Sequence, residues 1–210
     1  MLKKYLLSAG VFILAIAILT ISVMRSATAT YVFATPAPSG TAVLGEKTQE
    51  IEYGLPYPGG VLPNSPLWSL KALRDKVWYA VTANPLKKAE LALLFSDKRL
   101  GASITLFDLK KPEVALSTLS KGEKYLETAA QEEKIARSEG YDTSSFLLKL
   151  ATASLKHRQL IEGKIIPGAP ASANPDIVKI EDYAKNSYKS ARDGLNDKSL
   201  LSPIDPFDGQ

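Results

Sequence analysis

The sequence predicts an all-α protein, an antiparallel bundle of four to five helices. Three observations support this fold class. Apolar residues recur at spacings of three and four along most of residues 66–194, which is the period of one helix face. Ser-Pro and Asn-Pro pairs stand where such patterns begin, and no pair of alternating runs indicates a strand hairpin. The 210 residues leave room for about one globular domain.

An apolar N-terminal segment precedes the predicted bundle. Lys3 and Lys4 come before the uncharged run Leu6 to Met24, which as a helix would be about 28 Å long and would cross a bilayer. Small residues up to Ala29 also fit a cleavage site, so residues 1–29 are a signal-anchor or a signal peptide. The lysines place the N-terminal end in the cytoplasm. We expect a single-pass protein of the cell membrane with its C-terminal domain outside the cytoplasm, or a secreted protein if cleavage follows Ala29.

Residues 30–52 are rich in Thr, Ala, Pro and Ser without a sustained period, which predicts a flexible linker. The helical domain is expected at 53–194. It opens with a turn-rich segment in which four prolines each remove a backbone donor: Pro56, Pro58, Pro63 and Pro66. Apolar residues between these prolines predict a Pro-rich strap packed on the bundle, with a floppy spacer as the alternative.

Ser65-Pro66 and Asn84-Pro85 each combine an N-cap residue with proline at the first helical position. They predict two antiparallel helices, from 66 to about 83 and from 85 to about 109, with a hinge at Asn84-Pro85. The core stripe of the first helix comprises Leu67, Leu70, Arg74, Val77 and Val81, and that of the second comprises Leu86, Glu90, Leu93, Asp97, Leu100, Ile104 and Phe107. Charged residues therefore stand where packing alone would favour leucine.

Lys111-Pro112 predicts a third helix that ends at Glu139-Gly140, where glycine can adopt the left-handed conformation. A fourth helix is expected from Asp142 or Thr143 to the loop at 167–175. A fifth, more polar helix is expected from Asp176 to Gly194, and residues 195–210 are expected to be a disordered tail.

Arg74 and Asp97 come out at nearly equal heights on the two antiparallel helices, about ten and twelve residues from the hinge. They predict a buried structural ion pair, with Glu90 a turn or two nearer the hinge. The alternative is that the Glu90 and Asp97 carboxylates bind a ligand or a metal ion. The ion pair is favoured because carboxylate metal sites need more ligands.

Several function classes do not fit the composition. The chain has no cysteine, which excludes disulfides and thiolate zinc sites, and its net charge of +4 comes from interspersed charges rather than a nucleic-acid-binding block. Its one histidine, His157, has no Glu three residues before it, as a ferritin-like metal centre would need, and is expected at the surface or as a helix cap. No serine elbow or phosphate loop is present. We expect no catalytic residue, no metal ion and no cofactor.

Three aromatic residues of the first helix and two lysines at the start of the second form a candidate partner surface: Trp68, Trp78, Tyr79, Lys87 and Lys88. Packing on the core or the strap is the default expectation for the three aromatics, and a patch that faces a partner is the alternative. The two lysines oppose the dipole at a helix N-terminus, which makes them candidates for contact with an anionic envelope polymer or a lipid headgroup.

Five short motifs stand out in the first part of the predicted domain: Leu55-Pro56-Tyr57-Pro58-Gly59, Leu62-Pro63, Leu73-Arg74-Asp75, Asn84-Pro85-Leu86-Lys87-Lys88-Ala89-Glu90 and Asp97-Lys98-Arg99-Leu100. In these motifs the chain resembles a bacterial family of exported helical domains of unknown function. The resemblance covers approximately residues 53–165. It implies a single-pass or secreted helical protein and transfers no catalytic residue. The proline-rich loop and fifth helix after Ile166 depart from the family pattern.

Together these features predict a non-catalytic binding or structural module of the bacterial cell envelope, outside the cytoplasm and tethered by an N-terminal membrane helix. The expected partners are the membrane, through residues Leu6 to Met24, and an envelope protein or anionic envelope polymer, but not nucleic acid. The alternative function is an extracytoplasmic ligand- or metal-sensing domain that uses Glu90 and Asp97.

Overall fold

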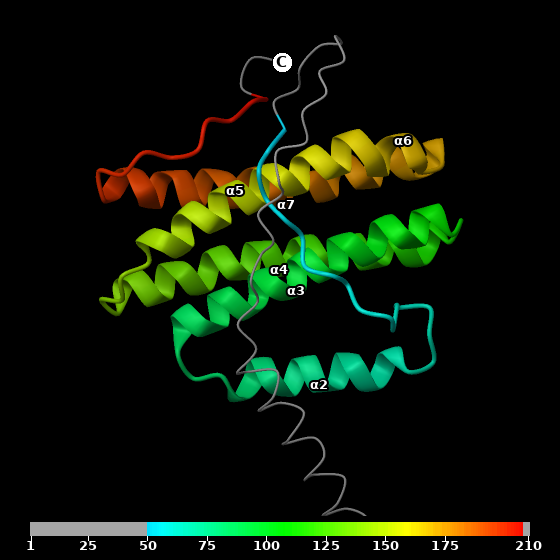
Figure 1. Cartoon of the computed structure of the whole chain (residues 1–210), viewed down its shortest axis with the longest axis horizontal. Coiled ribbons are helices and arrows are strands. Elements are labelled where there is room, and N and C mark those ends of the chain that lie inside the picture. The colour runs from blue at the N-terminus through cyan, green and yellow to red at the C-terminus, as the bar shows by residue number, and fades with distance from the viewer. Residues whose placement is uncertain (1–49, 208–210) are drawn as a thin grey trace, which may run out of the picture.

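The computed structural model describes residues 50–207. The predicted membrane segment and most of the predicted linker lie outside the described residues, as do residues 208–210. Every regular element of the described part is helical, which confirms an all-α bundle (Figure 1). The α-helices are α2 (Trp68–Val81), α3 (Pro85–Asp108), α4 (Pro112–Ser138), α5 (Ser144–Leu160), α6 (Ile166–Gly168) and α7 (Asn174–Asp197).

Proline and glycine set several helix boundaries where the sequence predicts them. α3 begins at Pro85 and α4 at Pro112, because the N–H that proline lacks would have no partner in a first turn. The Asn84 side chain caps α3 by accepting a hydrogen bond from the Lys87 backbone N–H at 3.0 Å. After α4, Gly140 has a φ of +85°, in the left-handed region that glycine adopts without strain.

Four long helices, α3, α4, α5 and α7, form the bundle (Figure 1). α4 packs against both α3 and α7, and α5 packs against α7. α3 and α4 approach closely: a Cβ added to Gly122 of α4 would lie 3.1 Å from the Cβ of Arg99 on α3. Buried apolar residues form two main clusters along the bundle, one that contains Leu93 and one that contains Leu119.

The predicted fourth helix ends in a π-helical turn, and the loop after it is more helical than the sequence predicts. The π-helical turn, Ile161–Ile165, continues α5 and leads into the short α6. The expected loop at 167–175 includes a 3-10 turn, Ala171–Ala173, and α7 then begins at the Asn174-Pro175 pair. α7 packs on the bundle as its fourth long helix.

Residues 50–67 cross the bundle before α2 begins (Figure 1). Tyr53 donates a hydrogen bond from its hydroxyl to Oδ2 of Asp97 on α3 at 2.8 Å. Lys71 of α2 donates from Nζ to the backbone carbonyl oxygen of Pro58 at 2.9 Å. These contacts make the proline-rich segment an ordered strap between the bundle and α2, as predicted.

α2 turns a different face to the bundle than the sequence predicts. Its predicted core stripe is largely exposed, with exposed fractions of 62% for Leu67 and Leu70 and 65% for Val81. The buried residue of α2 is Asp75, with 4% exposed. The apolar period identifies an amphipathic helix correctly, but it does not tell which of the two faces meets the bundle.

The C-terminal segment also differs from the sequence prediction, because its described residues pack on the bundle rather than being disordered. Phe207 is 5% exposed and joins the cluster that contains Leu93. The guanidinium of Arg158 lies 4.2 Å from the centre of the Phe207 ring. The Tyr188 hydroxyl donates to the backbone carbonyl oxygen of Pro203 at 2.7 Å. Prolines after α7 prevent further helix, but an extended segment can still place an aromatic ring in the core.

Candidate functional site

Charged side chains occupy a layer between the two apolar clusters of the bundle. His157 of α5 lies at the centre of this charged layer. Its Nε2 is 3.0 Å from Oδ1 of Asp97 on α3, and its Nδ1 is 2.8 Å from Oε1 of Glu123 on α4. The side chains of all three residues have 0% exposure. The charged layer therefore joins three of the four long helices at one height.

The strap completes the charged layer from outside the bundle. The Tyr53 hydroxyl donates to one carboxylate oxygen of Asp97, and the other oxygen contacts His157. Burial, followed by the charge of Asp97, raises the pKa of Tyr53 well above its ordinary value, so the phenol stays protonated and remains a donor. Asp97 thus links α3, α5 and the strap.

His157 is positively charged at neutral pH. Burial alone would lower the pKa of the imidazole, but the charges of Glu123 and Asp97 and their hydrogen bonds outweigh it and raise the pKa to about 10. Both ring nitrogens then carry protons, and each donates to one carboxylate. A buried cation between two anions is tolerated because each charge has a hydrogen-bonded partner.

The geometry of the charged layer suits a structural role. The two carboxylates lie at opposite ring nitrogens of His157, whereas the ligands of a metal ion must converge on one point. Within residues 50–207, no group of three or more His, Cys, Asp or Glu side chains could hold a metal ion. An imidazolium that donates from both nitrogens has no lone pair with which to accept a proton. The layer instead fixes the register of α3, α4 and α5.

The predicted ion pair between Arg74 and Asp97 is not formed. Arg74 bonds to its neighbour Asp75, with 2.7 Å between Nη2 and Oδ1, while Asp97 bonds to His157 and Tyr53. Equal height does not bring Arg74 and Asp97 together, because Asp97 points into the bundle and the Arg74 side of α2 does not face it. Glu90 is exposed, so the Glu90 and Asp97 carboxylates do not share one site.

The sequence prediction for His157 is wrong, and Glu123 is not predicted at all. The structure buries His157 completely instead of placing it at the surface or in a cap. A signal for both residues is present in the sequence. His157 stands four residues before the buried Ile161, and Glu123 stands between the buried Leu119 and Leu126. Both residues stand at core positions of their helical periods, as Asp97 does on α3, so a search for charged residues at such positions finds them.

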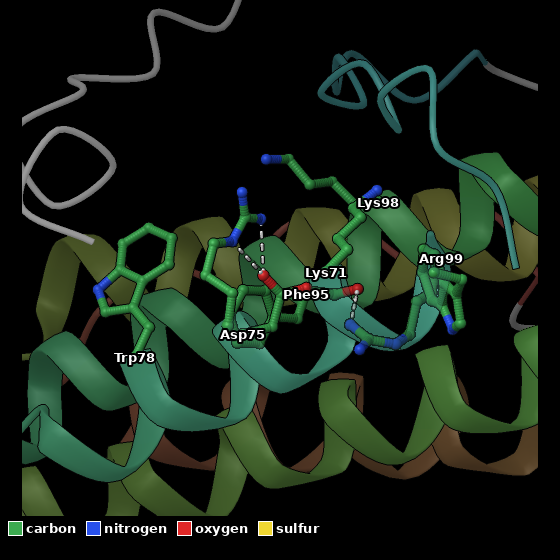
Figure 2. A pocket seen from close by; sticks show the side chains of 8 residues that line it. Lys71, Asp75, Trp78, Phe95, Lys98 and Arg99 are labelled. Atoms are coloured by element: carbon green, nitrogen blue, oxygen red, sulfur yellow. Dashed lines mark hydrogen bonds and ion pairs between the residues drawn. The ribbon is translucent and has the colours of Figure 1, made fainter. Parts of the chain in front are cut away.

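A second group of charged residues lines a hollow between α2 and α3 (Figure 2). The lining combines four cations, one carboxylate and three aromatic rings, namely Lys71, Arg74, Lys98, Arg99, Asp75, Trp68, Trp78 and Phe95. In the view of Figure 2, Asp75 lies between Trp78 and Arg99. Positive charge is therefore in excess around the hollow.

Arg99 is the most deeply buried of these cations, with 7% exposed. Its guanidinium lies 4.4 Å from the centre of the Tyr125 ring and donates from Nη1 to the carbonyl oxygen of Phe95 at 3.2 Å. Burial lowers the pKa of Arg99, and Tyr125 and Asp75 counteract that effect. Among the described residues, no carboxylate lies within ion-pair distance of Arg99. Stacking on aromatic rings, rather than an ion pair, accommodates this charge.

The aromatic residues of the predicted partner surface are directed mainly at the bundle. The rings of Trp78 and Phe95 meet edge to face with their centres 5.9 Å apart. The Tyr79 hydroxyl donates to Oε1 of Glu132 on α4 at 2.6 Å. Trp68 lines the hollow and lies 4.9 Å below the ammonium of Lys71. The default expectation of packing therefore fits all three aromatics better than a free patch.

The exposed apolar surface of α2 is its aliphatic side. This aliphatic face consists of Leu67, Leu70, Leu73 and Val81, whose exposed fractions range from 54% to 65%. The predicted surface lysines lie nearby at the start of α3. Lys87 is exposed, and the Lys88 ammonium lies 5.6 Å from the centre of the Tyr79 ring.

Comparison with known families assigns the helical domain. A family model described as "Domain of unknown function (DUF5667)" matches residues 60–165, a segment that contains α2, α3, α4 and α5. The chain belongs to this family. The DUF5667 match includes the three members of the charged layer, but it begins after Tyr53 and ends before α7. No curated protein and no solved structure matches the chain.

The family description supplies neither an activity nor a location. Among the helices of residues 50–207, none combines the length and apolar character needed to cross a bilayer. The apolar run Leu6 to Met24 lies outside the described residues, so the membrane anchor of this DUF5667 protein stays a prediction.

Proposed function

We propose that this DUF5667 protein is a non-catalytic binding or structural module of the bacterial cell envelope, held outside the cytoplasm by an N-terminal membrane helix. The observation that carries the proposal is the exposed aliphatic face of α2. Leu70 and Leu73 expose 62% and 54% of their surface on one side of α2, and Leu67 at the N-cap exposes 62%. An exposed apolar stripe of this kind is typical of an interaction surface.

The bundle provides a rigid base for that surface. Its charged layer fixes three helices through His157, and the strap is bonded to the same layer through Tyr53. α2 is held by contacts at both ends, from Lys71 to the strap and from Tyr79 to α4. A helix anchored in this way can present one face to a partner without rearranging the bundle.

The location is tested by labelling single cysteines, since the chain contains no cysteine. Lys189→Cys lies at an exposed position of α7, and Lys4→Cys lies before the predicted membrane helix. In intact bacterial cells, a membrane-impermeant maleimide should label Lys189→Cys but not Lys4→Cys, and lysis should expose both. Protection of Lys189→Cys in intact cells would place the domain inside the cytoplasm and overturn the proposal.

The binding role is tested by photo-crosslinking in intact cells. A photoreactive amino acid at Leu70 on the aliphatic face should give crosslinks to an envelope component. The matched control is Leu148 of α5, which is 41% exposed on another part of the surface. Equal yields at the two positions would show that the aliphatic face has no special role.

A further inference from the structure

We infer that the aliphatic face of α2 docks on the surface of an anionic lipid bilayer, the membrane to which the chain is tethered. The inference rests on the proposed function, because it takes the N-terminal membrane helix as given. The bilayer surface is then the occupant of the aliphatic face, which is the face that carries the proposed binding role.

The charge around α2 favours an anionic partner. Residues 66–88 contain one carboxylate, Asp75, and five cations, which are Lys71, Arg74, Lys76, Lys87 and Lys88. The whole chain, by contrast, has 26 Lys and Arg against 22 Asp and Glu. Asp75 is buried and bonded to Arg74, so these two charges offset each other and the surplus of positive charge comes from the four lysines. Basic segments of this type are attracted to anionic headgroups.

The order of residues around α2 matches a helix that lies in a bilayer interface. At 100° per residue, the aliphatic residues occupy about one third of the circumference. Lys71 follows at one edge of this stripe, and Lys76 stands beyond the other. Arg74 falls within the stripe and is bonded to Asp75. Aliphatic side chains could therefore enter the acyl boundary while the exposed Lys76 reaches phosphate groups. Lys71 is held by the strap, because its Nζ donates to the carbonyl oxygens of Pro58 and Val61.

The tether keeps α2 within reach of the bilayer. The predicted membrane helix ends at Met24, and the described domain begins at Glu50. Glu50 lies beside α5, with 3.8 Å between its Oε1 and the Nζ of Lys156, and the strap crosses the bundle from there to α2 (Figure 1). Fully extended, the 25 residues between Met24 and Glu50 can span about 80 Å, which is long enough to pass around the bundle. A face with weak affinity can dock under these conditions, because the tether raises its effective concentration at the membrane.

A second copy of the chain is a less suitable occupant. Pairing two aliphatic faces about a two-fold axis would bring the cations at the stripe edges of both copies together, and like charges at an interface oppose association. Lipid phosphates would instead neutralise them. Fluorescence in vesicles with and without an anionic lipid distinguishes a bilayer from a second copy as the occupant.

The test uses the full chain reconstituted into vesicles of phosphatidylcholine, with or without phosphatidylglycerol. Leu70→Cys is labelled with the environment-sensitive fluorophore NBD, and Leu148→Cys is the matched control. NBD at position 70 should brighten and shift to shorter wavelength when phosphatidylglycerol is present, and lipids brominated on the acyl chains should quench it. NBD at position 148 should show neither change. Lys76→Gln should lower the ratio of docked to undocked protein about fivefold.

The outcomes separate this inference from the proposed function. Extraction at alkaline pH first shows whether the chain is anchored, and a chain washed from the vesicles would overturn both proposals. If the chain stays anchored while NBD at position 70 remains in water, the docking inference is wrong and the proposed tether stands. An NBD change that depends on protein concentration but not on phosphatidylglycerol or brominated lipid would identify a second copy as the occupant and would also overturn the inference.

Discussion

The bundle and α2 distribute charged and apolar side chains in opposite ways. Asp97, Glu123 and His157 are fully buried in the bundle, whereas Leu67 and Leu70 on α2 are 62% exposed. The buried charges are stable because each has a hydrogen-bonded partner of opposite charge. The exposed leucines face no packed element of the described chain. Complementary partners therefore decide which residues are buried here, and the face without a partner is the one free to bind another molecule.

The largest effect is expected from removing the centre of the charged layer. Asp97→Ala should lower the free energy of unfolding by about 3–5 kcal/mol, because it leaves the His157 cation and the Tyr53 hydroxyl without this partner. Glu90→Ala is the matched control, an exposed carboxylate on the same helix, and should change stability by less than about 0.5 kcal/mol. Urea unfolding of the full chain measures both. Equal costs would mean that the charged layer does not hold the bundle.

The pH dependence of stability tests the same layer without removing a carboxylate. The pKa of His157 is about 10 in the folded protein and 6.5 in the unfolded chain, so its stabilisation is complete below the lower value and is lost as pH rises through the higher one. Between pH 7 and 10.5, the wild type should lose roughly 4 kcal/mol more than His157→Gln. Urea unfolding at the two pH values gives this difference, and parallel losses in both proteins would contradict a charged His157.

A smaller effect is expected where the strap meets the bundle. Tyr53→Phe removes the hydroxyl that donates to Asp97 and should cost about 1.5–3 kcal/mol, the range for a hydrogen bond to a charged group. Tyr57→Phe, at a residue 76% exposed, is the control and should be nearly neutral. Deuterium exchange should also become faster in the strap of Tyr53→Phe. Unchanged exchange there would show that this bond does not hold the strap.

Local chemistry made much of the bundle predictable from the sequence. Asn84 and Pro85 begin α3, Pro112 begins α4 and Gly140 follows its end, because caps and proline act within a single turn. The all-α class and the strap follow from similarly local signals.

The site was less predictable, because its contacts depend on the relative rotation of helices. The stripe of α3 correctly singled out Asp97, but a helical period cannot tell whether Arg74 or His157 lies opposite it. The same ambiguity hid the outward direction of Leu70 on α2. Phe207 was missed for another reason: its burial depends on a gap in a distant core, which no local pattern records.

The opposition between α2 and the bundle is tested most directly by one paired measurement. Leu70→Ala and Leu93→Ala make the same chemical change on the aliphatic face of α2 and in the bundle core, where the exposed fractions are 62% and 1%. Urea unfolding of the two full-length variants, followed by circular dichroism, should show a loss of about 2–5 kcal/mol for Leu93→Ala. Leu70→Ala should stay within about 0.5 kcal/mol of the wild type. A comparable loss at both positions would show that the aliphatic face is packed within the fold and is not a free binding surface.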